Sequence, residues 1–368
     1  MRHIYLAATG QNRGKTTVSL GVLDGFLRRG LSTGFMKPVG QRTVIEDGVP
    51  ADEDAVLMRQ VFGLAEPFTQ MSPVHIPRGF TQTYIEGGFV EDLPARIRAA
   101  HAAFARDREI LLIEGTGHAG VGAVIGLSNA VVAAMLGAPA VIVSEGGVGR
   151  PIDEIVLNAS LFQRHGVQVA GAIVNKVDLD AKPHLATTLE RGLARHGIPL
   201  LGVLPYRPIL SNPTLAMVLE GVRGETLNAG PDLDLVIGGV AIGAMEPAHM
   251  LQRIGPRSLV IVPSDRTDVI RAIVGAHVDG GGDGNGALGL VLTGGYRPDG
   301  AVVDAIRAAN LFATLVPEDT YIVASEVHDL LVKTHPSDLG KIAEIKALVW
   351  EYLFIDRILG VATSAAVG

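Results

Sequence analysis

The chain has 368 residues, among them 31 Lys and Arg, 38 Asp and Glu, 46 Gly and no Cys, and its formal net charge is −7. The acidic balance argues against a general nucleic-acid surface and against an anionic-membrane surface. The lack of cysteine excludes disulfides, Cys-ligated zinc, iron–sulfur clusters, thiol nucleophiles and a Cys-dependent glutaminase within this sequence.

Short apolar runs alternate with helical patterns from residue 1 to residue 210. Strands are predicted over 2–8, 31–37, 109–114, 140–144, 167–174 and 199–204. Helices are predicted over 15–29, 53–62, 93–106, 129–136, 152–165 and 182–196. Most strand runs are continuously apolar, as expected for strands that are covered on both faces. The alternation predicts an α/β fold with a parallel sheet flanked by helices.

A proline-containing segment over 205–213 precedes a second alternating series. Its predicted strands are 233–237, 258–262, 286–292 and 313–316, and its predicted helices are 244–253, 268–277, 301–309, 320–333 and 339–354. We therefore predict a domain over 1–210 and a smaller α/β domain over 225–355, which includes the C-terminal helix.

The sequence gives no sign of a membrane segment or a secretory signal. The apolar run after Met1-Arg2-His3 is too short for a signal core with a cleavage site. The one long uncharged stretch, 115–144, contains several glycines, a proline and polar residues. It fits a loop, a helix and a strand better than a membrane span, so we expect a cytoplasmic protein.

The strongest motif follows the first predicted strand and opens the first helix: Ala8-Thr9-Gly10-Gln11-Asn12-Arg13-Gly14-Lys15-Thr16-Thr17. In that context consecutive backbone N–H groups cradle phosphates, the lysine reaches the β- and γ-phosphate oxygens, and the following threonine can ligate Mg²⁺. The pattern has one departure, because Thr9 stands where the first glycine is expected. We predict a nucleotide site formed by Gly10, Asn12, Arg13, Gly14, Lys15, Thr16 and Thr17.

Lys37 and Glu114 lie at predicted strand ends, where open α/β sheets bind ligands, and a third candidate pair of carboxylates lies at the start of a helix. Lys37 could stabilise a transferring phosphoryl group or hold a carboxylate, or it could be a solvated surface lysine. Glu114, between an apolar strand and a glycine-rich turn, fits a carboxylate that binds Mg²⁺ or positions water. Asp52 and Asp54 precede a helix, where they either cap it or supply a second metal ligand.

The segment Asn175-Lys176-Val177-Asp178 closes another strand. Its spacing is that of the guanine-binding motif of GTPases, but four residues also match by chance. An asparagine at this place can equally hold adenine through its amide group.

Residues 1–210 resemble the dethiobiotin synthetase-like (BioD-like) branch of P-loop ATPases. The matching segments are the phosphate loop, Lys37-Pro38-Val39, Glu114-Gly115, Asn175 and Leu201-Gly202-Val203-Leu204-Pro205. With Thr17-Val18-Ser19-Leu20-Gly21-Val22, this part is still more similar to the N-terminal region of bacterial phosphate acetyltransferases. Residues 225–335 resemble the DRTGG domain that follows that region, on Asp265-Arg266-Thr267-Asp268 and Leu292-Thr293-Gly294-Gly295. We do not expect the acetyltransferase domain itself in this sequence.

The resemblance implies ATP and Mg²⁺ as cofactors and a homodimer as the oligomeric state. It implies Mg²⁺ near Thr16, Asp54 and Glu114, stabilisation of a phosphoryl or carboxylate group by Lys37, and an adenine contact by Asn175. The family's Ser-Pro-His substrate segment is not found, and the nearest match is Ser72-Pro73-Val74-His75.

In the second domain, two motif loops each follow a predicted strand. If the strands are adjacent and parallel, the loops form one edge and could bind an anion or effector, with Arg266 as the charge. The alternative is an Asp–Arg pair that locks the loops together. The residues concerned are Asp265, Arg266, Thr267, Thr293, Gly294 and Gly295.

Three functional hypotheses follow. The first is an ATP- and Mg²⁺-binding protein with a regulatory or metabolite-sensing role. The second is an ATP-dependent carboxylate-activating ligase of the dethiobiotin synthetase or cobyrinate amidation type, with Lys15, Lys37 and Glu114 as catalytic residues. The third is a GTPase switch, which depends on the 175–178 motif alone. Each requires a nucleotide, and the sequence does not identify the accompanying small molecule.

Overall fold

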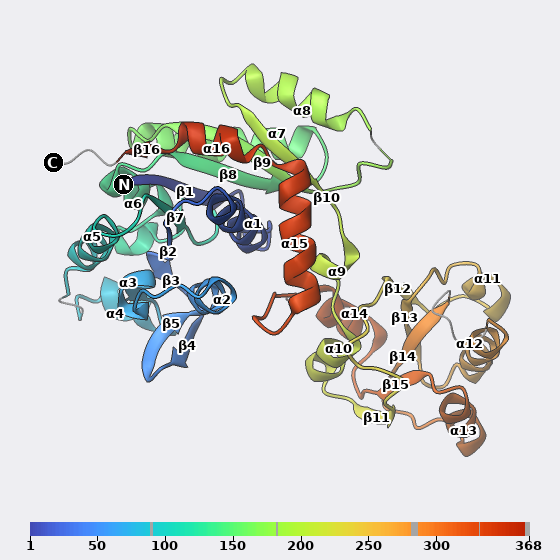
Figure 1. The fold of residues 1–368 in the computed structure, drawn as a ribbon. Coiled ribbons are helices and arrows are strands. Elements are labelled where there is room, and N and C mark those ends of the chain that lie inside the picture. Colours follow the sequence, from blue (N-terminus) through green and yellow to red (C-terminus); the bar gives the residue numbers. More distant parts are fainter. Residues whose placement is uncertain (89–90, 182, 281–285, 331, 365–368) are drawn as a thin grey trace. The chain divides into compact units, whose positions relative to one another are not determined.

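The computed structural model of the chain describes residues 1–88, 91–181, 183–280, 286–330 and 332–364. It divides into two compact units, which are drawn in Figure 1. Unit 1 comprises Met1–Tyr206 together with Thr334–Gly368, and unit 2 comprises Arg207–Lys333. Both units are α/β, which confirms the predicted fold class. No helix in the described ranges is both long enough and apolar enough to cross a membrane.

Unit 1 is built on a sheet with the strand order β10-β9-β8-β1-β7-β2, in which these neighbours are parallel. A short antiparallel strand, β16, pairs with the start of β1. Two small sheets, β3 with β6 and β4 with β5, accompany it. The strands are β1 (Arg2–Ala8), β2 (Thr33–Met36), β3 (Val39–Gly40), β4 (Thr43–Glu46), β5 (Val49–Asp52), β6 (Val74–His75), β7 (Ile110–Glu114), β8 (Ala140–Glu145), β9 (Val169–Val177), β10 (Leu200–Pro205) and β16 (Thr363–Ser364).

The helices of unit 1 connect these strands and return at the end of the chain. They are α1 (Lys15–Arg28), α2 (Glu53–Phe62), α3 (Phe68–Met71), α4 (Phe80–Ile85), α5 (Leu93–Phe104), the 3₁₀ helix η1 (Ala123–Ile125), α6 (Asn129–Leu136), α7 (Gly149–Arg164), α8 (Leu185–Ala194), α15 (Leu339–Tyr352) and α16 (Ile355–Val361). Because β1, β7, β8 and β9 are parallel, their carboxyl ends lie at one edge of the sheet. Strand β1 lies between β7 and β8, and its Leu6 pairs with Glu114 of β7. At the end of β8, Glu145 pairs with Asn175 of β9. The segment after β1 therefore lies between the ends of these strands.

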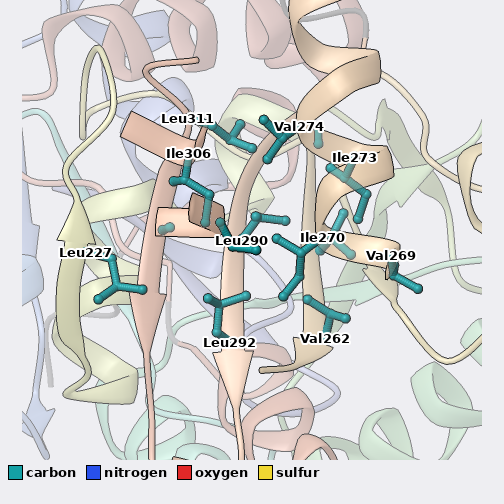
Figure 2. Packing of buried hydrophobic residues seen from close by; sticks show 14 of the residues in the cluster. Leu227, Val262, Val269, Ile270, Ile273, Val274, Leu290, Leu292, Ile306 and Leu311 are labelled. Carbon is teal, nitrogen blue, oxygen red and sulfur yellow. The ribbon is translucent and has the colours of Figure 1, made fainter. Parts of the chain in front are cut away.

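Unit 2 contains a five-stranded sheet with the order β11-β15-β14-β13-β12, in which only the β11–β15 pair is antiparallel. Apolar residues from both helices and strands fill one face, as Figure 2 shows for Ile270 and Ile273 of α12, Leu290 and Leu292 of β14 and Ile306 of α13. The elements are α9 (Pro208–Ser211), α10 (Leu215–Val222), β11 (Glu225–Asn228), β12 (Gly239–Ile242), α11 (Pro247–Leu251), β13 (Ser258–Pro263), α12 (Thr267–Asp279), β14 (Ala287–Thr293), α13 (Gly300–Ala308), β15 (Phe312–Leu315) and α14 (Thr320–His328).

The strand predicted over 233–237 is not formed. Asp234 N donates to Asp232 Oδ1 at 2.8 Å in a local turn, and the segment contributes only an isolated antiparallel bridge between Val236 and Thr214. The apolar residues of the segment still pack: Ile237 is buried in the second core cluster of unit 2, and Leu233 and Leu235 lie against it. Strand β12 begins two residues after the predicted strand ends.

The C-terminal helix, which we expected in the second domain, belongs to unit 1. Helix α15 packs along α1, where Val349 lies against Gly21 and Lys346 Nζ is 3.3 Å from Asp24 Oδ1. Beyond the helix, Phe354 N donates to Leu201 O at 3.0 Å. The sequence pattern shows that this helix is amphipathic. It does not show against which of the two units the apolar face of the helix packs.

Substituting Gly21 with alanine should destabilise unit 1. A Cβ on Gly21 would overlap the Val349 side chain, and such overpacking costs about 1–3 kcal/mol, more than the ~1 kcal/mol that alanine gains over glycine in a helix. Trp350, the chain's one tryptophan, lies 5.3 Å from the Arg28 guanidinium on α1, so its fluorescence reports unfolding of this contact. The matched control is Gly275→Ala in α12, where no atom lies near the added Cβ and a small gain in stability is expected. An unchanged urea midpoint for Gly21→Ala would contradict the packing.

Acid should weaken unit 1 through a buried histidine pair. His3 Nε2 lies 3.0 Å from Gly137 O and therefore carries the proton, so His3 Nδ1 accepts from His101 Nε2 at 3.2 Å. Burial lowers the pKa of His3, and burial lowers the pKa of His101 to about 4. Because the unfolded chain binds these protons more readily, stability is present above pH ~6.5 and decreases as the pH falls toward 4. His101→Gln should reduce that decrease in urea titrations, whereas His196→Gln, at an exposed position, should not.

Candidate functional site

The glycine-rich segment forms a loop between β1 and α1, as the motif predicts. Gly14 precedes the helix with a left-handed φ of 87°, and Asn12 is also left-handed, with a φ of 57°. A Cβ on Gly14 would overlap Asn175 Nδ2, so both the backbone conformation and the space require glycine. Lys15 is the first residue of α1, at the helix N-terminus where an anion is stabilised.

Five predicted residues meet directly beside this loop. Lys37 Nζ lies 2.5 Å from Asp54 Oδ2 and 2.8 Å from Glu114 Oε1. Thr16 Oγ1 lies 3.0 Å from Asp54 Oδ1 and 3.4 Å from Glu114 Oε1. Lys15 is nearly buried, and it shares the electrostatic environment of Lys37, Asp54 and Glu114. The structure therefore brings together residues from α1, β7, the end of β2 and the start of α2.

Burial and opposite charges perturb the pKa values of this cluster strongly. Burial raises the pKa of Glu114 to about 7, although Lys37 partly opposes the shift. Burial also lowers the pKa of Lys15 to about 8, and the nearby Lys37 adds to that effect. For Lys37, burial is outweighed by Asp54 and Glu114, which raise its pKa well above the usual value. Lys37 is 4% exposed, so the alternative of a solvated surface lysine is not observed.

The cluster fits a Mg²⁺ ion shared with a nucleotide. Glu114 is fully buried, and its Oε2 has no hydrogen-bond partner among the described residues. Mg²⁺ is usually held by one or two carboxylates together with phosphate oxygens and water. Thr16, Asp54 and Glu114 supply such a partial set, whereas no group of three or more His, Asp or Glu side chains in the described ranges could hold a metal alone.

Asp52 and Asp54 have different roles. Asp52 caps helix α2, because its Oδ1 accepts from Asp54 N at 3.0 Å, and its Oδ2 accepts from Arg42 N at 3.3 Å. Asp54 instead faces Lys37 and Thr16. Of the two alternatives for a second carboxylate, the geometry favours Asp54.

The 175–178 segment contacts the phosphate loop through its first two residues, whereas its aspartate bonds within a local turn. Asn175 Nδ2 donates to Arg13 O at 3.1 Å. Asp178 Oδ1 accepts from Ala181 N at 3.0 Å, which makes it the cap of a local turn. One oxygen of the carboxylate that a GTPase would need for guanine is thus engaged in a local turn.

Two glutamates outside the predicted set, Glu145 and Glu154, contact residues of the loop. Arg13 forms an ion pair with Glu145 at the end of β8. Thr9, which departs from the expected glycine, donates from Oγ1 to Glu154 Oε2 at 2.9 Å. Glu145 follows an apolar strand just as Glu114 does, and that shared pattern is the signal that could have identified it.

An open pocket of about 50 Å³ lies beside the turn that follows Glu114. It has a mixed lining with polar groups from Gln41, Thr81, Thr116 and Asn129 and apolar groups from Val39, Ile76, Val121, Val124, Ile125 and Leu127. Asn129 is fixed there, because its Oδ1 accepts from Tyr5 Oη at 2.8 Å and from Thr116 N at 3.1 Å. The volume admits only a small group of a few atoms, such as a carboxylate, beside these polar side chains.

The two motif loops of unit 2 lie side by side, since Ser264 N donates to Thr293 O at 2.9 Å. Arg266 does not pair with Asp265; its Nε and one Nη lie 2.9 and 3.0 Å from the carboxylate of Asp268. The same guanidinium donates to Met245 O at 3.1 Å. The charge that we assigned to an effector is therefore already paired, at the start of the helix that Thr267 opens.

The glycines of the second loop have a conformational role. Gly294 and Gly295 have φ values of 87° and 74°, and their N–H groups donate to Glu318 O and Val316 O. Thr293 Oγ1 lies 2.7 Å from Thr320 Oγ1. These bonds join the end of β14 to the segment after β15, so both glycines have a structural role.

Comparison with known families agrees with this architecture. Residues 2–214 match the AAA_26 family model, which describes an AAA domain. The chain belongs to the AAA_26 family. Residues 217–330 match the DRTGG domain model, so a DRTGG domain follows the AAA_26 domain, as the motifs predict.

Curated relatives of this AAA_26 protein include phosphate acetyltransferases. The protein of Synechocystis sp. is 24% identical over 368 residues, which cover 97% of this chain and 51% of the relative. The protein of Pseudomonas putida is 28% identical over 349 residues, which cover 90% of this chain and 47% of the relative. The chain thus spans about half the length of the curated relatives it matches, and the predicted resemblance is confirmed.

Solved structures with some similarity to the AAA_26 and DRTGG domains are more distant. The CBS and DRTGG domains of a Clostridium perfringens pyrophosphatase, complexed with diadenosine tetraphosphate, are 17% identical with a TM-score of 0.28, and the match covers 38% of this chain and 60% of that one. MinD of Pyrococcus horikoshii, complexed with Mg-ADP, is 14% identical with a TM-score of 0.35, covering 56% and 83%. Similarity at this level gives no information on the ligands of the present chain.

Proposed function

We propose that the AAA_26 domain binds ATP with Mg²⁺ and that this binding has a regulatory or metabolite-sensing role. The observation that supports the proposal best is the cluster of Thr16, Lys37, Asp54 and Glu114 beside a phosphate loop with an intact Lys15. The loop N–H groups and Lys15 would bind phosphate oxygens. When bound, Mg²⁺ neutralises phosphate charge, and Thr16, Asp54 and Glu114 are the residues that would hold it.

Lys37 is the residue placed to act on a phosphoryl group. Its ammonium is held by Asp54 and Glu114 rather than by solvent. A fixed positive charge at this place stabilises negative charge on a transferring phosphate without reorganisation. If the domain hydrolyses or transfers phosphate, Lys15 and Lys37 would stabilise the charge, and Glu114 would orient the ion or a water molecule.

The pocket beside the Glu114 turn favours a second candidate, an ATP-dependent ligase that activates a carboxylate. The pocket adjoins the Glu114 turn through Thr116, which follows Glu114 by two residues, and its other polar groups come from Gln41, from Thr81 of α4 and from Asn129 of α6. The GTPase alternative has less support, because one oxygen of the Asp178 carboxylate caps a turn. A homodimeric state and a cytoplasmic location stay predictions from the sequence and its resemblance.

Titration with ATP, ADP and GTP in the presence of Mg²⁺, followed by measurement of phosphate release, tests these proposals. We expect ATP and ADP to bind and GTP to bind more weakly. Slow phosphate release that does not respond to small carboxylic acids supports the regulatory role, whereas rapid release with one such acid would replace it by the ligase. A preference for GTP would overturn the assignment of ATP.

A further inference from the structure

A β-bulge interrupts strand β9 next to the phosphate loop. Between the pairs Val174–Val203 and Val177–Pro205, β9 contains one residue more than its partner β10. Lys176 lies in this bulge with a left-handed φ of 55°. That conformation is unfavourable for a lysine, and it persists only where the surrounding structure stabilises it. Such an outlier in contact with a ligand-binding loop calls for a functional explanation.

The bulge lets two consecutive side chains reach the same loop. In a regular strand, neighbouring side chains point to opposite faces. Here Asn175 Nδ2 donates to Arg13 O at 3.1 Å, and Lys176 Nζ donates to Asn12 O at 2.8 Å. Two adjacent carbonyl groups of the phosphate loop are therefore held by two adjacent residues of β9.

Holding a carbonyl group also sets the direction of the next N–H group. A trans peptide is planar, and its C=O and N–H point in opposite directions. The bond from Lys176 to Asn12 O thus directs the N–H of Arg13 away from β9, and the bond from Asn175 to Arg13 O does the same for the N–H of Gly14. These are N–H groups that a phosphate loop uses to bind phosphate oxygens.

Glu145 holds the lysine in place. Its Oε2 lies 3.0 Å from Lys176 Nζ, and the same carboxylate pairs with Arg13. Glu145 is paired with Asn175 in the β8–β9 ladder, so the carboxylate is supplied by the neighbouring strand end. The side chain of Lys176 is 31% exposed, and the Glu145 pairing limits its freedom.

We propose that Lys176 is a positioning residue of the nucleotide site. It fixes the orientation of the Arg13 N–H toward the polyphosphate of a nucleotide without contacting a phosphate itself. The proposal depends on the proposed function, because it requires that the loop binds a nucleotide. Its consequence is that part of the nucleotide affinity comes from a loop that is ordered before binding.

The substitution Lys176→Gly separates positioning from folding. Glycine adopts a φ of 55° readily, so the variant should unfold at the same or a higher urea concentration than the original chain. Nucleotide affinity should nevertheless fall by about tenfold, since a hydrogen bond from a charged donor is lost. Hydrogen exchange of the Arg13 and Gly14 amides should become faster in the absence of nucleotide. If Lys176 had only a structural role, its substitution would lower both the stability of the chain and its nucleotide affinity, or neither.

The matched control is Arg223→Gly in unit 2. Arg223 is also a cationic residue in the left-handed region, with a φ of 50°, so its replacement relieves the same strain while the affinity should remain unchanged. Lys176→Arg, which keeps a cationic donor, should retain most of the affinity. Glu145→Gln should weaken binding in the same way as Lys176→Gly, and the double variant should lose little more than either alone.

The probe is ADP with Mg²⁺, measured by calorimetric titration of the full chain. Unaltered ADP affinity and unaltered exchange in Lys176→Gly would overturn the positioning role while leaving the proposed function intact, provided that Lys15→Met weakens binding strongly. If the original chain does not bind ADP, or if Lys15→Met binds it equally well, the proposed function fails and the positioning role fails with it.

Discussion

Replacing Lys15 with methionine should weaken ATP binding by about 100-fold or more. The ammonium group at the start of α1 is the cation that reaches the phosphates, and charge-assisted hydrogen bonds are worth about 1.5–3 kcal/mol each. Calorimetric titration of the variant with ATP and Mg²⁺ measures this loss directly. Because burial lowers the pKa of Lys15, its charged form is disfavoured in the folded protein. The variant should therefore be as stable as the original chain or more stable.

A control lysine variant tests whether the loss of affinity is specific to Lys15. Lys341→Met removes a lysine of the same unit, one that lies 3.7 Å from Asp338, and it should leave ATP affinity unchanged. Equal affinity of the Lys15→Met variant and the original chain would contradict phosphate binding by this loop. A large loss of stability in Lys15→Met would contradict the direction of its pKa shift.

Replacing Lys37 with methionine should destabilise unit 1 by about 3 kcal/mol or more. Lys37 is buried between Asp54 and Glu114, and removing one partner of a buried ion pair leaves the other charge uncompensated. The loss should increase with pH. Burial already raises the pKa of Glu114 to about 7, and without Lys37 the pKa rises further, so folding opposes ionisation of Glu114 more strongly as the pH increases. Urea titrations at pH 6, 7 and 8, followed by Trp350 fluorescence, measure the difference.

The double variant Lys37→Met/Glu114→Gln is the control for this explanation. Glutamine has nearly the shape of glutamate but carries no charge, so the double variant should be more stable than Lys37→Met alone. It should also lose the pH dependence of the difference. If the single and double variants are equally unstable at every pH, the loss comes from packing rather than from the buried carboxylate.

The phosphate-loop side of the site could be predicted because its chemistry is local in sequence. A glycine-rich segment between an apolar strand and a helix with Lys15 and Thr16 allows few other structures. Lys37 and Glu114 were identifiable for a related reason: parallel strands end at one edge, so polar residues at strand ends meet there. The short contacts that join them to Asp54 depend on side-chain packing, and no spacing rule gives them.

The hairpin of β4 and β5 was not predicted, although the sequence contains a signal for it. Strands β4 and β5 form a hairpin whose turn is Asp47-Gly48, and both residues have positive φ values. An Asp-Gly pair between short β-type runs is a strong hairpin signal, and here it leads directly into the helix that presents Asp54. The hairpin was overlooked because its strands have four residues each and mixed burial, so they lack a long apolar run.

The bulge at Lys176 and the return of α15 to unit 1 had no usable signal. A bulge depends on the register between β9 and β10, which sequence periodicity does not define when strands are continuously apolar. The position of α15 depends on long-range packing of Val349 against Gly21. Glycines inside a helix show that something approaches closely, but not which segment does.

Calorimetric titration of the full chain with ATP in the presence and absence of Mg²⁺ tests the central claim most directly. We predict saturable binding at one site per chain that is tighter with Mg²⁺, that ADP competes for, and that Lys15→Met weakens by about 100-fold or more. Absence of heat and of competition at any nucleotide concentration, or equally tight binding by Lys15→Met, would contradict the assignment of the phosphate loop and its acidic cluster as a nucleotide site.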